Sequence, residues 1–338
     1  MHSRQEGRYR CSLCGKTFSQ RAGTLFFRCR TPPEEIVLVL TLVAHGCPIA
    51  AVEAAFRLQA RTVRRWVQAA GEQCERLHRQ EVERERPLGQ VQADELRVKA
   101  QGQILWLAMA IAVPARLWLG AVVSAQRNKA LIVALAQRVR ACLLAAPLLV
   151  CVDGLAAYGE AFRKSLRTAV PTGKRGRPRM VPWEGVVIGQ VIKRCEGRRV
   201  VEVVRRIVWG TAQKAERLLL STQAGGVLNT AYIERLNATF RARLAVLCRR
   251  TRGLCRRKEW LQAASYLIGT VYNFCTEHAS LTMDGERRTP AMAAGITDHC
   301  WSVAELLWYR IPPPPWKPPA RPGRRSRALR ELIQRWTT

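Results

Sequence analysis

The alternation of apolar and polar residues divides the chain into regions with different periods. Residues 34–78 place apolar side chains three and four positions apart, which predicts helices. Three apolar runs separated by turn residues then predict strands at 89–98, 105–113 and 117–123. The pattern therefore indicates a small helical unit followed by the beginning of a sheet.

A second set of predicted elements continues this sheet. Residues 128–145 have helical spacing, and PLLVCVDG at 147–154 is a short apolar run that ends in an acid, as a buried parallel strand does. Residues 185–210 predict two strands joined at Glu196 and Gly197, and helices dominate from 211 to about 280. Three strands, a helix, a further strand and then helices indicate an α/β domain.

The stretch IAAVEAAFRLQARTVRRW at 49–66 fits a helix-turn-helix. Its buried positions are occupied by Ile49, Val52, Phe56, Leu58, Val63 and Trp66. Arg61, Thr62, Arg64 and Arg65 then project from the second helix, where side chains of this motif meet DNA.

Two residues depart from that motif. Glu53 stands where a small residue is usual, and Arg57 stands where the turn prefers glycine, so an ordinary helical hairpin is the alternative. The charged residues 72–88 that follow predict a helical linker to the α/β domain.

The charge balance favours a polyanionic partner. Lys and Arg number 56 against 25 Asp and Glu, a net charge of +31, which points to nucleic acid, with an anionic membrane surface as the rival. The longest apolar candidate, 104–125, is broken by Pro114 and Arg116, and two strands with a turn explain it better than a membrane span. The first ten residues are polar and do not resemble a signal peptide, so we expect most of the 12 cysteines to be reduced, buried thiols.

Three carboxylates fall at positions where they can converge. Asp94 lies within the first predicted strand, Asp153 ends the fourth, and Glu234 begins a later helix. Strand interiors are depleted of Asp, and a buried carboxylate is costly unless it is paired or binds a metal. Such a set can hold two Mg²⁺ ions that clamp a phosphodiester. Strand alternation does not choose between Asp94 and its neighbour Glu95.

The helix around Glu234 is otherwise rich in arginine. If Thr230 caps it, Glu234 lies in the first turn, where the helix dipole favours a carboxylate. Asn237 and Arg241 share one flank with Glu234. The expected buried stripe consists of Ile233, Leu236, Phe240, Leu244 and Leu247. Glu234 is then either a metal ligand or a surface residue placed by the dipole.

Residues 229–252, NTAYIERLNATFRARLAVLCRRTR, resemble the Glu block of DDE transposases of the first-described insertion-sequence type. ADEL at 93–96, with Leu96 in place of the usual aromatic, and VCVDGLAAYGEAF at 150–162 resemble that family's two Asp blocks. YNFCTEHASL and RTPAMAAGIT resemble its closing motif, so the likeness covers most of 9–307.

The resemblance implies a ribonuclease-H-like catalytic domain in which Asp94, Asp153 and Glu234 hold Mg²⁺ or Mn²⁺. It implies binding to double-stranded DNA, both element ends and target, and joining of a 3′-OH to the target. It further implies a homo-oligomer in the active assembly, no membrane association, and a place at the nucleoid in a bacterial cytoplasm. A metal-dependent nuclease without joining activity and a truncated, non-enzymatic DNA-binding remnant are the alternatives.

The expected organisation has four parts. They are a partial zinc-ribbon-like segment at 1–30, a helix-turn-helix domain at 31–80, the catalytic domain at 88–285, and a C-terminal segment with a Pro-rich basic tail at 286–338. The family opens with two C-x-x-C pairs, but only Cys11 and Cys14 form one here, whereas structural Zn²⁺ takes four ligands. A zinc site and a zinc-free remnant both remain open.

Several further residues are candidates for DNA contact. GKRGRPR at 173–179 contains Arg175 and Arg177 and is either a minor-groove reader or a basic loop that contacts phosphate. Asn237 and Arg241 are expected to position the scissile strand, and Arg243 is expected to contact DNA. Asn273 and His278 are weaker candidates near the site.

Overall fold

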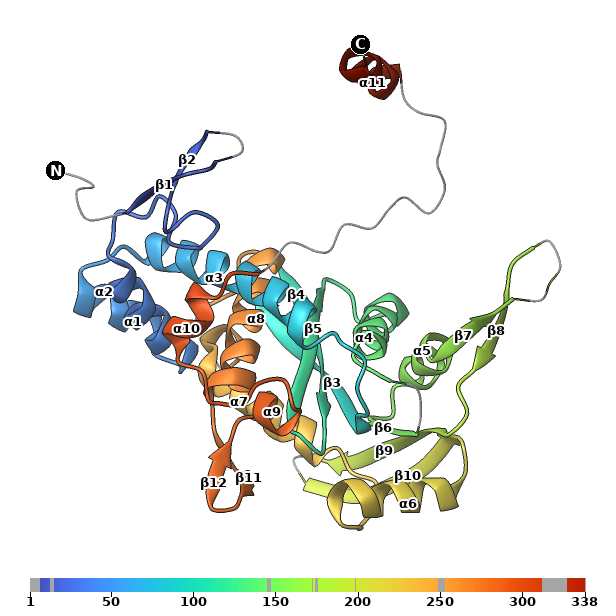
Figure 1. Cartoon of the computed structure of the whole chain (residues 1–338). Helices are drawn as coiled ribbons and strands as arrows, with labels where there is room; N and C mark the ends of the chain where they lie inside the picture. Colours follow the sequence, from blue (N-terminus) through green and yellow to red (C-terminus); the bar gives the residue numbers. More distant parts are fainter. Residues whose placement is uncertain are drawn as a thin grey trace.

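A six-stranded mixed sheet forms the centre of the molecule, with the strand order β10-β9-β6-β3-β4-β5 (Figure 1). The computed structural model describes residues 7–12, 15–144, 147–171, 173, 176–197, 199–248, 253–311 and 327–337. The strands of the sheet are β3 Gly89–Ala100, β4 Gln103–Ala112, β5 Leu117–Ser124, β6 Leu148–Val152, β9 Val186–Glu196 and β10 Arg199–Trp209. This mixed sheet confirms the expected α/β class.

The strand directions combine a meander with parallel pairs. β3, β4 and β5 are antiparallel neighbours, whereas β6 pairs in parallel with both β3 and β9, and β10 returns antiparallel to β9. Each strand falls within or close to its expected range, and 104–125 forms two strands and a turn as expected. Among the described residues, no helix is both long and apolar enough to cross a bilayer.

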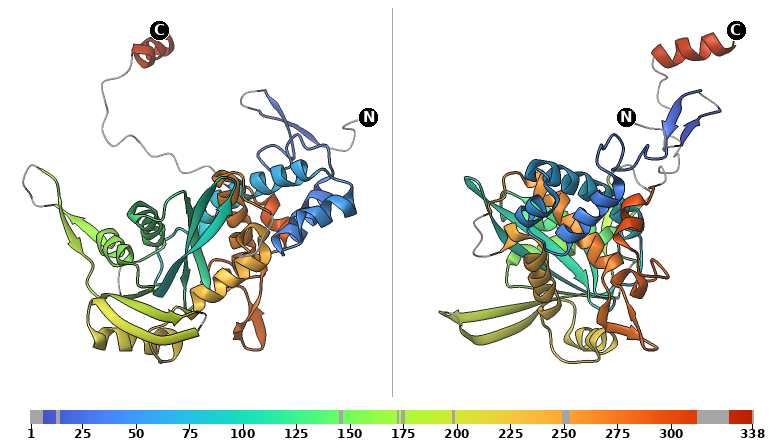
Figure 2. Two further views of the ribbon diagram at one scale, coloured as in Figure 1. Left: turned by 180° about the vertical axis from the view of Figure 1, so that it is seen from behind. Right: turned by 90° about the vertical axis from the view of Figure 1, so that its left-hand side faces the viewer.

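Helices lie on both faces of the sheet (Figures 1 and 2). α4 (Lys129–Ala141) and α5 (Ala156–Ser165) cover one face, and α4 begins where the Asn128 side chain accepts a hydrogen bond from Leu131 N. The opposite face carries α3 Ala60–Glu81, α6 Ala212–Gln223, α7 Ala231–Arg243 and α8 Lys258–Cys275. The sheet is therefore the middle layer of three.

α3 continues through the residues that the charge pattern predicted to be a linker. Its inner side buries Gln73, Cys74, Leu77 and His78, while the charged residues face outward. At Gly71 a Cβ atom would lie 1.9 Å from the carbonyl oxygen of Ala263 in α8, so only glycine permits this helix contact. The predicted helix is confirmed as far as Glu81, but it packs against α8 and is not a free linker, because its charged outer face hid an apolar stripe of helical period.

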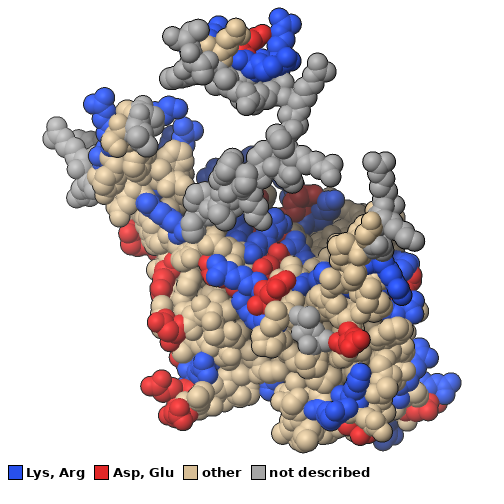
Figure 3. Space-filling model, turned by 45° about the vertical axis from the view of Figure 1, so that its right-hand side comes forward, with Lys and Arg blue, Asp and Glu red and all other residues tan. Residues whose placement is uncertain are grey.

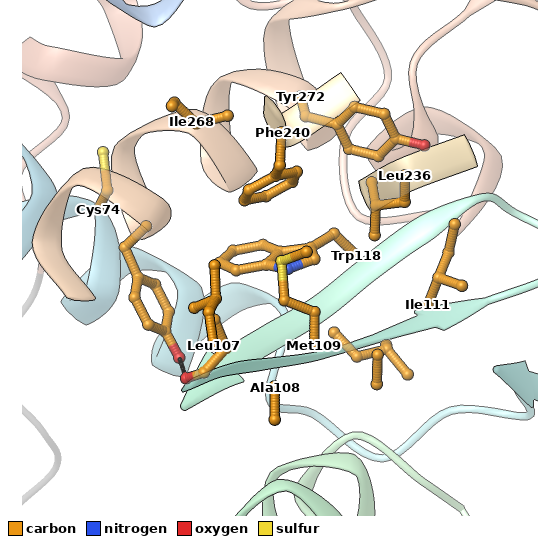
Figure 4. Close-up of a cluster of buried hydrophobic side chains, with 14 of the residues drawn as sticks. Cys74, Leu107, Ala108, Met109, Ile111, Trp118, Leu236, Phe240, Ile268 and Tyr272 are labelled. Atoms are coloured by element: carbon orange, nitrogen blue, oxygen red, sulfur yellow. Dashed lines mark hydrogen bonds between the residues drawn. The ribbon is translucent and has the colours of Figure 1, made fainter. Parts of the chain in front are cut away.

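Trp118 of β5 is at the centre of the apolar cluster between the sheet and the helices (Figure 4). Its ring centroid lies 5.8 Å from that of Phe240 in α7 and 5.0 Å from that of Tyr266 in α8. A Cβ at Gly269 would come within 2.4 Å of the Trp118 ring, so glycine lets α8 approach it. The expected buried stripe of α7 packs here, although the helix ends at Arg243.

The N-terminal helices α1 (Pro33–Ala44) and α2 (Ile49–Phe56) precede α3. Of the expected buried positions, Val52, Val63 and Trp66 are fully buried; Ile49, Phe56 and Leu58 are partly buried against the core. Arg57 between α2 and α3 has φ 54°, the left-handed conformation that explains why glycine is favoured at this place.

The remaining elements are short. They are β1 Arg8–Arg10, β2 Thr17–Ser19, β7 Arg167–Val170, β8 Arg179–Pro182, a 3-10 turn at Ala245–Leu247, β11 His278–Met283, β12 Glu286–Arg288, α9 Pro290–Ala293, α10 Val303–Trp308 and α11 Arg327–Thr337. The expectation that most cysteines are buried was wrong for the described residues: Cys74, Cys142, Cys151 and Cys255 are buried, but the others are partly buried or, at Cys195, Cys248 and Cys300, exposed.

Candidate functional site

Two aspartates emerge side by side from the middle of the sheet. β3 and β6 are parallel neighbours whose register pairs Ala93 with Val152. Asp94, within β3, and Asp153, directly after the end of β6, therefore lie side by side. Asp153 is held by its own loop, since its Oδ1 accepts a hydrogen bond of 2.9 Å from Leu155 N. The sheet register brings together two carboxylates that lie far apart in the sequence.

Glu234 reaches the same place from α7. The side chain of Gln92, two residues before Asp94, accepts hydrogen bonds of 3.0 Å from both Tyr232 N and Ile233 N. Gln92 therefore ties the first turn of α7 to β3, next to Asp94. Figure 1 shows α7 running along the sheet from this point.

Thr230 occupies the N-cap position of α7 but does not cap it with its side chain. Its hydroxyl instead donates a 2.6 Å hydrogen bond to Glu234 Oε1, while Asn229 Oδ1 accepts from Ala231 N at 3.1 Å. Thr230 is therefore the N-cap residue and Glu234 lies in the first turn, as expected, but the Thr230 hydroxyl bonds Glu234 and makes no capping bond.

Asp94, Asp153 and Glu234 line one pocket of about 280 Å³ together with Lys193 of β9. Burial raises the pKa of Asp94 to about 7, and the negative charges of Glu95, Asp153 and Glu234 add to this. The pocket thus concentrates more negative charge than its own surroundings neutralise. A bound cation would relieve that repulsion.

Glu95 is separated from the pocket by partners of its own. Its carboxylate forms an ion pair with Arg127 and accepts a 2.6 Å hydrogen bond from the buried hydroxyl of Tyr158. Asp94, by contrast, is bonded by Asn237 Nδ2 at 2.7 Å and faces the pocket. These contacts show that Asp94, and not Glu95, faces the pocket, a choice that the alternation of strand residues left open.

A metal ion can be held by this cluster. Carboxylate oxygens of Asp94, Glu95 and Asp153 all lie within 4.8 Å of one another. That grouping includes Glu95 and leaves out Glu234, whereas the pocket includes Glu234 and leaves out Glu95. Glu234 is the better candidate for the third ligand, because both oxygens of Glu95 are already bonded and the Glu95 side chain is 1% exposed.

The cationic side chains around the acids are the part that sequence reasoning missed. Lys193 Nζ lies 2.5 Å from Glu234 Oε1, and Arg127 Nη2 lies 3.5 Å from Asp153 Oδ2. Partial burial acts to raise the pKa of Glu234, but the bonds from Lys193 and Thr230 outweigh it and hold that pKa below its usual value. Glu234 and Asp153 therefore each have a cationic partner within the chain, whereas the side chain that bonds Asp94 is the neutral amide of Asn237.

The residues expected to position a DNA strand occupy different environments. Asn237 is 2% exposed and bonded to Asp94, so its side chain orients that acid. Arg243 is partly buried, and its Nη2 donates to Thr276 Oγ1 at 3.2 Å. Arg241 is partly exposed on the same helix.

Asn273 and His278 have partners away from the acids. The side chain of Asn273 is fully buried and exchanges two hydrogen bonds of 2.9 Å with the backbone of Trp118. The ring of His278 packs edge-on against Tyr272, with centroids 4.7 Å apart. Asn273 therefore joins α8 to β5 and does not belong to the pocket.

Arg61, Arg64 and Arg65 are exposed at the start of α3, beside the half-buried Thr62, and all four line a second, larger cleft. Figure 3 shows how widely Lys and Arg are spread over one face of the molecule.

Two further expectations depend partly on residues outside the described ranges. Arg177 lies exposed in the connection between β7 and β8, and Arg175 falls outside the described residues. Cys14 also falls outside them, so the expected zinc site at Cys11 and Cys14 stays a prediction.

No protein-family model matches this chain, and no curated protein matches its sequence.

Proposed function

We propose that the protein is a DNA transposase that cleaves DNA at element ends and joins the 3′-OH to target DNA. The observation that carries this proposal is the convergence of Asp94, Asp153 and Glu234 at one pocket. The acids come from the middle strand, its parallel neighbour and a later helix. The net charge of +31 supports a nucleic acid as the partner.

The strand arrangement supports assigning residues 88–285 to the ribonuclease-H-like class. An antiparallel meander β3-β4-β5 is followed by a helix, and β6 and β9 then add in parallel on the other side of β3. The first two acids lie on the two central strands of this order. The resemblance of the sequence to DDE transposases leads to the same class.

The chemistry of the pocket fits a hard divalent cation. Its donors are carboxylate oxygens, which Mg²⁺ and Mn²⁺ prefer, and the pKa of Asp94 is raised first by burial and further by the neighbouring carboxylates. Asp94 and Asp153 would hold the metal with Glu234 completing the set, and the bound metal would activate water and stabilise charge on the phosphate.

The side chains around these acids have separate roles in the proposal. Asn237 donates to Asp94 and so orients the carboxylate toward the pocket. Arg127 balances Glu95 and Asp153, and Lys193 balances Glu234 while the pocket holds no substrate. Cleavage needs water as the nucleophile, and joining needs the freed 3′-OH, so both steps can use one pocket without a covalent enzyme intermediate.

The N-terminal unit supports a role in recognising DNA. α2 and α3 are joined by a short turn with Arg57 in the left-handed conformation, and α3 presents Arg61, Arg64 and Arg65 to solvent. We propose that these residues form a helix-turn-helix that contacts the element ends.

Asp153→Asn tests the proposed chemistry. The variant should lose cleavage and joining on a duplex carrying the DNA that flanks the gene, and should still bind that duplex, because it removes a metal-holding charge and no arginine. Glu160→Gln on α5 is the matched control, since Glu160 pairs with Lys129 and lies outside the pocket. Normal cleavage by Asp153→Asn in Mg²⁺ would refute the assignment, and cleavage without joining by the wild type would identify a nuclease.

A further inference from the structure

A cleft of about 1410 Å³ lies between the N-terminal helices and the segment that connects α7 to α8. One wall consists of the α1–α2 turn and the start of α3, with Arg61, Arg64 and Arg65. The other consists, among the described residues, of Arg243 and 244–246 at the end of α7, of 253–257, and of Trp260 in α8. This open cleft exceeds the usual 300–1000 Å³ of small-molecule sites, so it has room for a larger ligand.

The lining of the cleft carries one sign of charge. Its described lining residues include six arginines and no Asp or Glu. The second wall supplies Arg243, Arg256 and Arg257, of which Arg256 and Arg257 are exposed. None of the exposed arginines of either wall has an ion-pair partner within the described residues. Elsewhere Arg138 is paired with Glu75 and Glu83.

The two walls are held together by direct contacts. Trp260 Nε1 donates a 3.2 Å hydrogen bond to the carbonyl oxygen of Arg64. At Gly46, in the α1–α2 turn, a Cβ atom would lie 2.8 Å from the carbonyl oxygen of Ala242 at the end of α7. The cleft is therefore a preformed surface, and binding there does not require the walls to close.

We propose that this cleft binds the phosphate backbone of double-stranded DNA. Arg256 and Arg257 contact the phosphates from the side opposite to α3. Rows of unpaired guanidinium groups on two facing walls are complementary to phosphates, and arginine binds them in a bidentate manner. The proposal extends the proposed function, because it adds a second wall to the surface expected on α3 alone.

α7 connects this cleft to the acidic pocket. Nine residues separate Glu234 from Arg243 along the helix, a rise of about 14 Å. Duplex DNA rises 3.4 Å per base pair, so a duplex lying along α7 would place the cleft roughly four base pairs from the phosphate at the acids. This spacing, unlike the charge of the cleft, rests on the proposed function.

Salt-dependent binding of a labelled duplex in EDTA tests the cleft without any cleavage. Arg256→Ala with Arg257→Ala should reduce the slope of log K against log salt by about 1.8, as should Arg64→Ala with Arg65→Ala. The matched control, Arg217→Ala with Arg287→Ala, removes the same charge from α6 and β12 and should leave the slope near that of the wild type. A slope unchanged by the Arg256 and Arg257 substitutions overturns the proposal, whether or not the protein cuts DNA.

The spacing is tested separately with a neutral methylphosphonate placed at single positions on a duplex that the wild type cuts. Affinity of the wild type should fall when the neutral group lies about four base pairs from the cut, and the Arg256 and Arg257 double variant should not respond at that position. If the neutral group at that position lowered the affinity of both proteins equally, the placement would be overturned. The two proposals can also fail separately. If the wild type cut no DNA but the double variant bound DNA more weakly in EDTA, the cleft would be supported and the transposase function rejected.

Discussion

Replacing Lys193 with methionine should tighten the binding of Mn²⁺ to the acidic pocket. Lys193 Nζ lies 2.5 Å from Glu234 Oε1, so its ammonium occupies the carboxylate oxygen that a metal would need. Methionine has a side chain of similar length without the charge. The variant therefore frees Glu234 while changing the shape of the pocket little.

The size of the effect follows from the exposure of the pair. The side chains of Lys193 and Glu234 are 40% and 46% exposed, and ion pairs in such positions contribute about 0.2–1 kcal/mol. If metal binding breaks this pair, its loss in Lys193→Met should lower the Kd for Mn²⁺ roughly 1.4-fold to 5-fold. The metal-free variant should lose about the same free energy of unfolding, because Glu234 then faces Asp94 and Asp153 without a cation.

Isothermal titration with Mn²⁺ measures the Kd, and thermal unfolding across the same titration measures the stabilisation that the metal provides. Lys129→Met is the matched control: Lys129 also forms a lysine–glutamate pair, at 2.6 Å from Glu160, but lies outside the pocket. A Kd that rises or stays the same in Lys193→Met, with the control unchanged, would show that Glu234 is not a metal ligand or that Lys193 does not compete for it.

Three further predictions concern the fold and the third acid. Glu234→Gln should lower the metal-free free energy of unfolding by about 0.2–1 kcal/mol and remove the Mn²⁺-induced rise in Tm; a rise in metal-free stability would contradict the ion pair. Gly71→Ala should destabilise by about 1–3 kcal/mol in urea titrations because its Cβ meets α8, whereas Glu72→Ala on the exposed side should stay within about 0.5 kcal/mol. Burial lowers the pKa of His78 to about 3. Below pH 6.5 the imidazole of His78 is therefore protonated in the unfolded chain but stays neutral in the folded chain. Stability should therefore fall by up to about 1.4 kcal/mol per pH unit as pH drops from 6.5 toward 4, and His78→Phe should flatten this slope.

The strands and the two aspartates could be read from the sequence because their signals are local. An apolar run such as LLVCV must be buried on both faces, and an acid directly after it is exceptional enough to notice. The sequence could not show which of Asp94 and Glu95 faces the pocket, since both lie in the same strand and differ only in their tertiary contacts. Arg127 and Tyr158, which bind Glu95, lie 32 and 63 residues away in the chain.

The cations of the pocket and the second wall of the cleft were missed for a related reason. Lys193 lies within a strand beside another basic residue, and nothing in its neighbourhood marks it as the partner of Glu234, 41 residues later. Arg256 and Arg257 look like any of the other basic residues in a chain with 56 of them. Gln92 did carry a usable signal, because a glutamine within a buried strand needs a hydrogen-bond partner, here the first turn of α7.

The continuity of α3 sets a scale for the whole molecule. One unbroken helix starts at the arginines of the cleft and ends against the sheet, and Gly71 locks it to α8 partway along. If α3 reads DNA and the carboxylates cut it, as proposed, this helix would fix the distance between the two surfaces. The register between a recognised sequence and its cut would then be set by the folded chain. Moving the recognised sequence by one base pair would rotate it about a tenth of a turn around the duplex. A rigid helix could not adjust to that rotation.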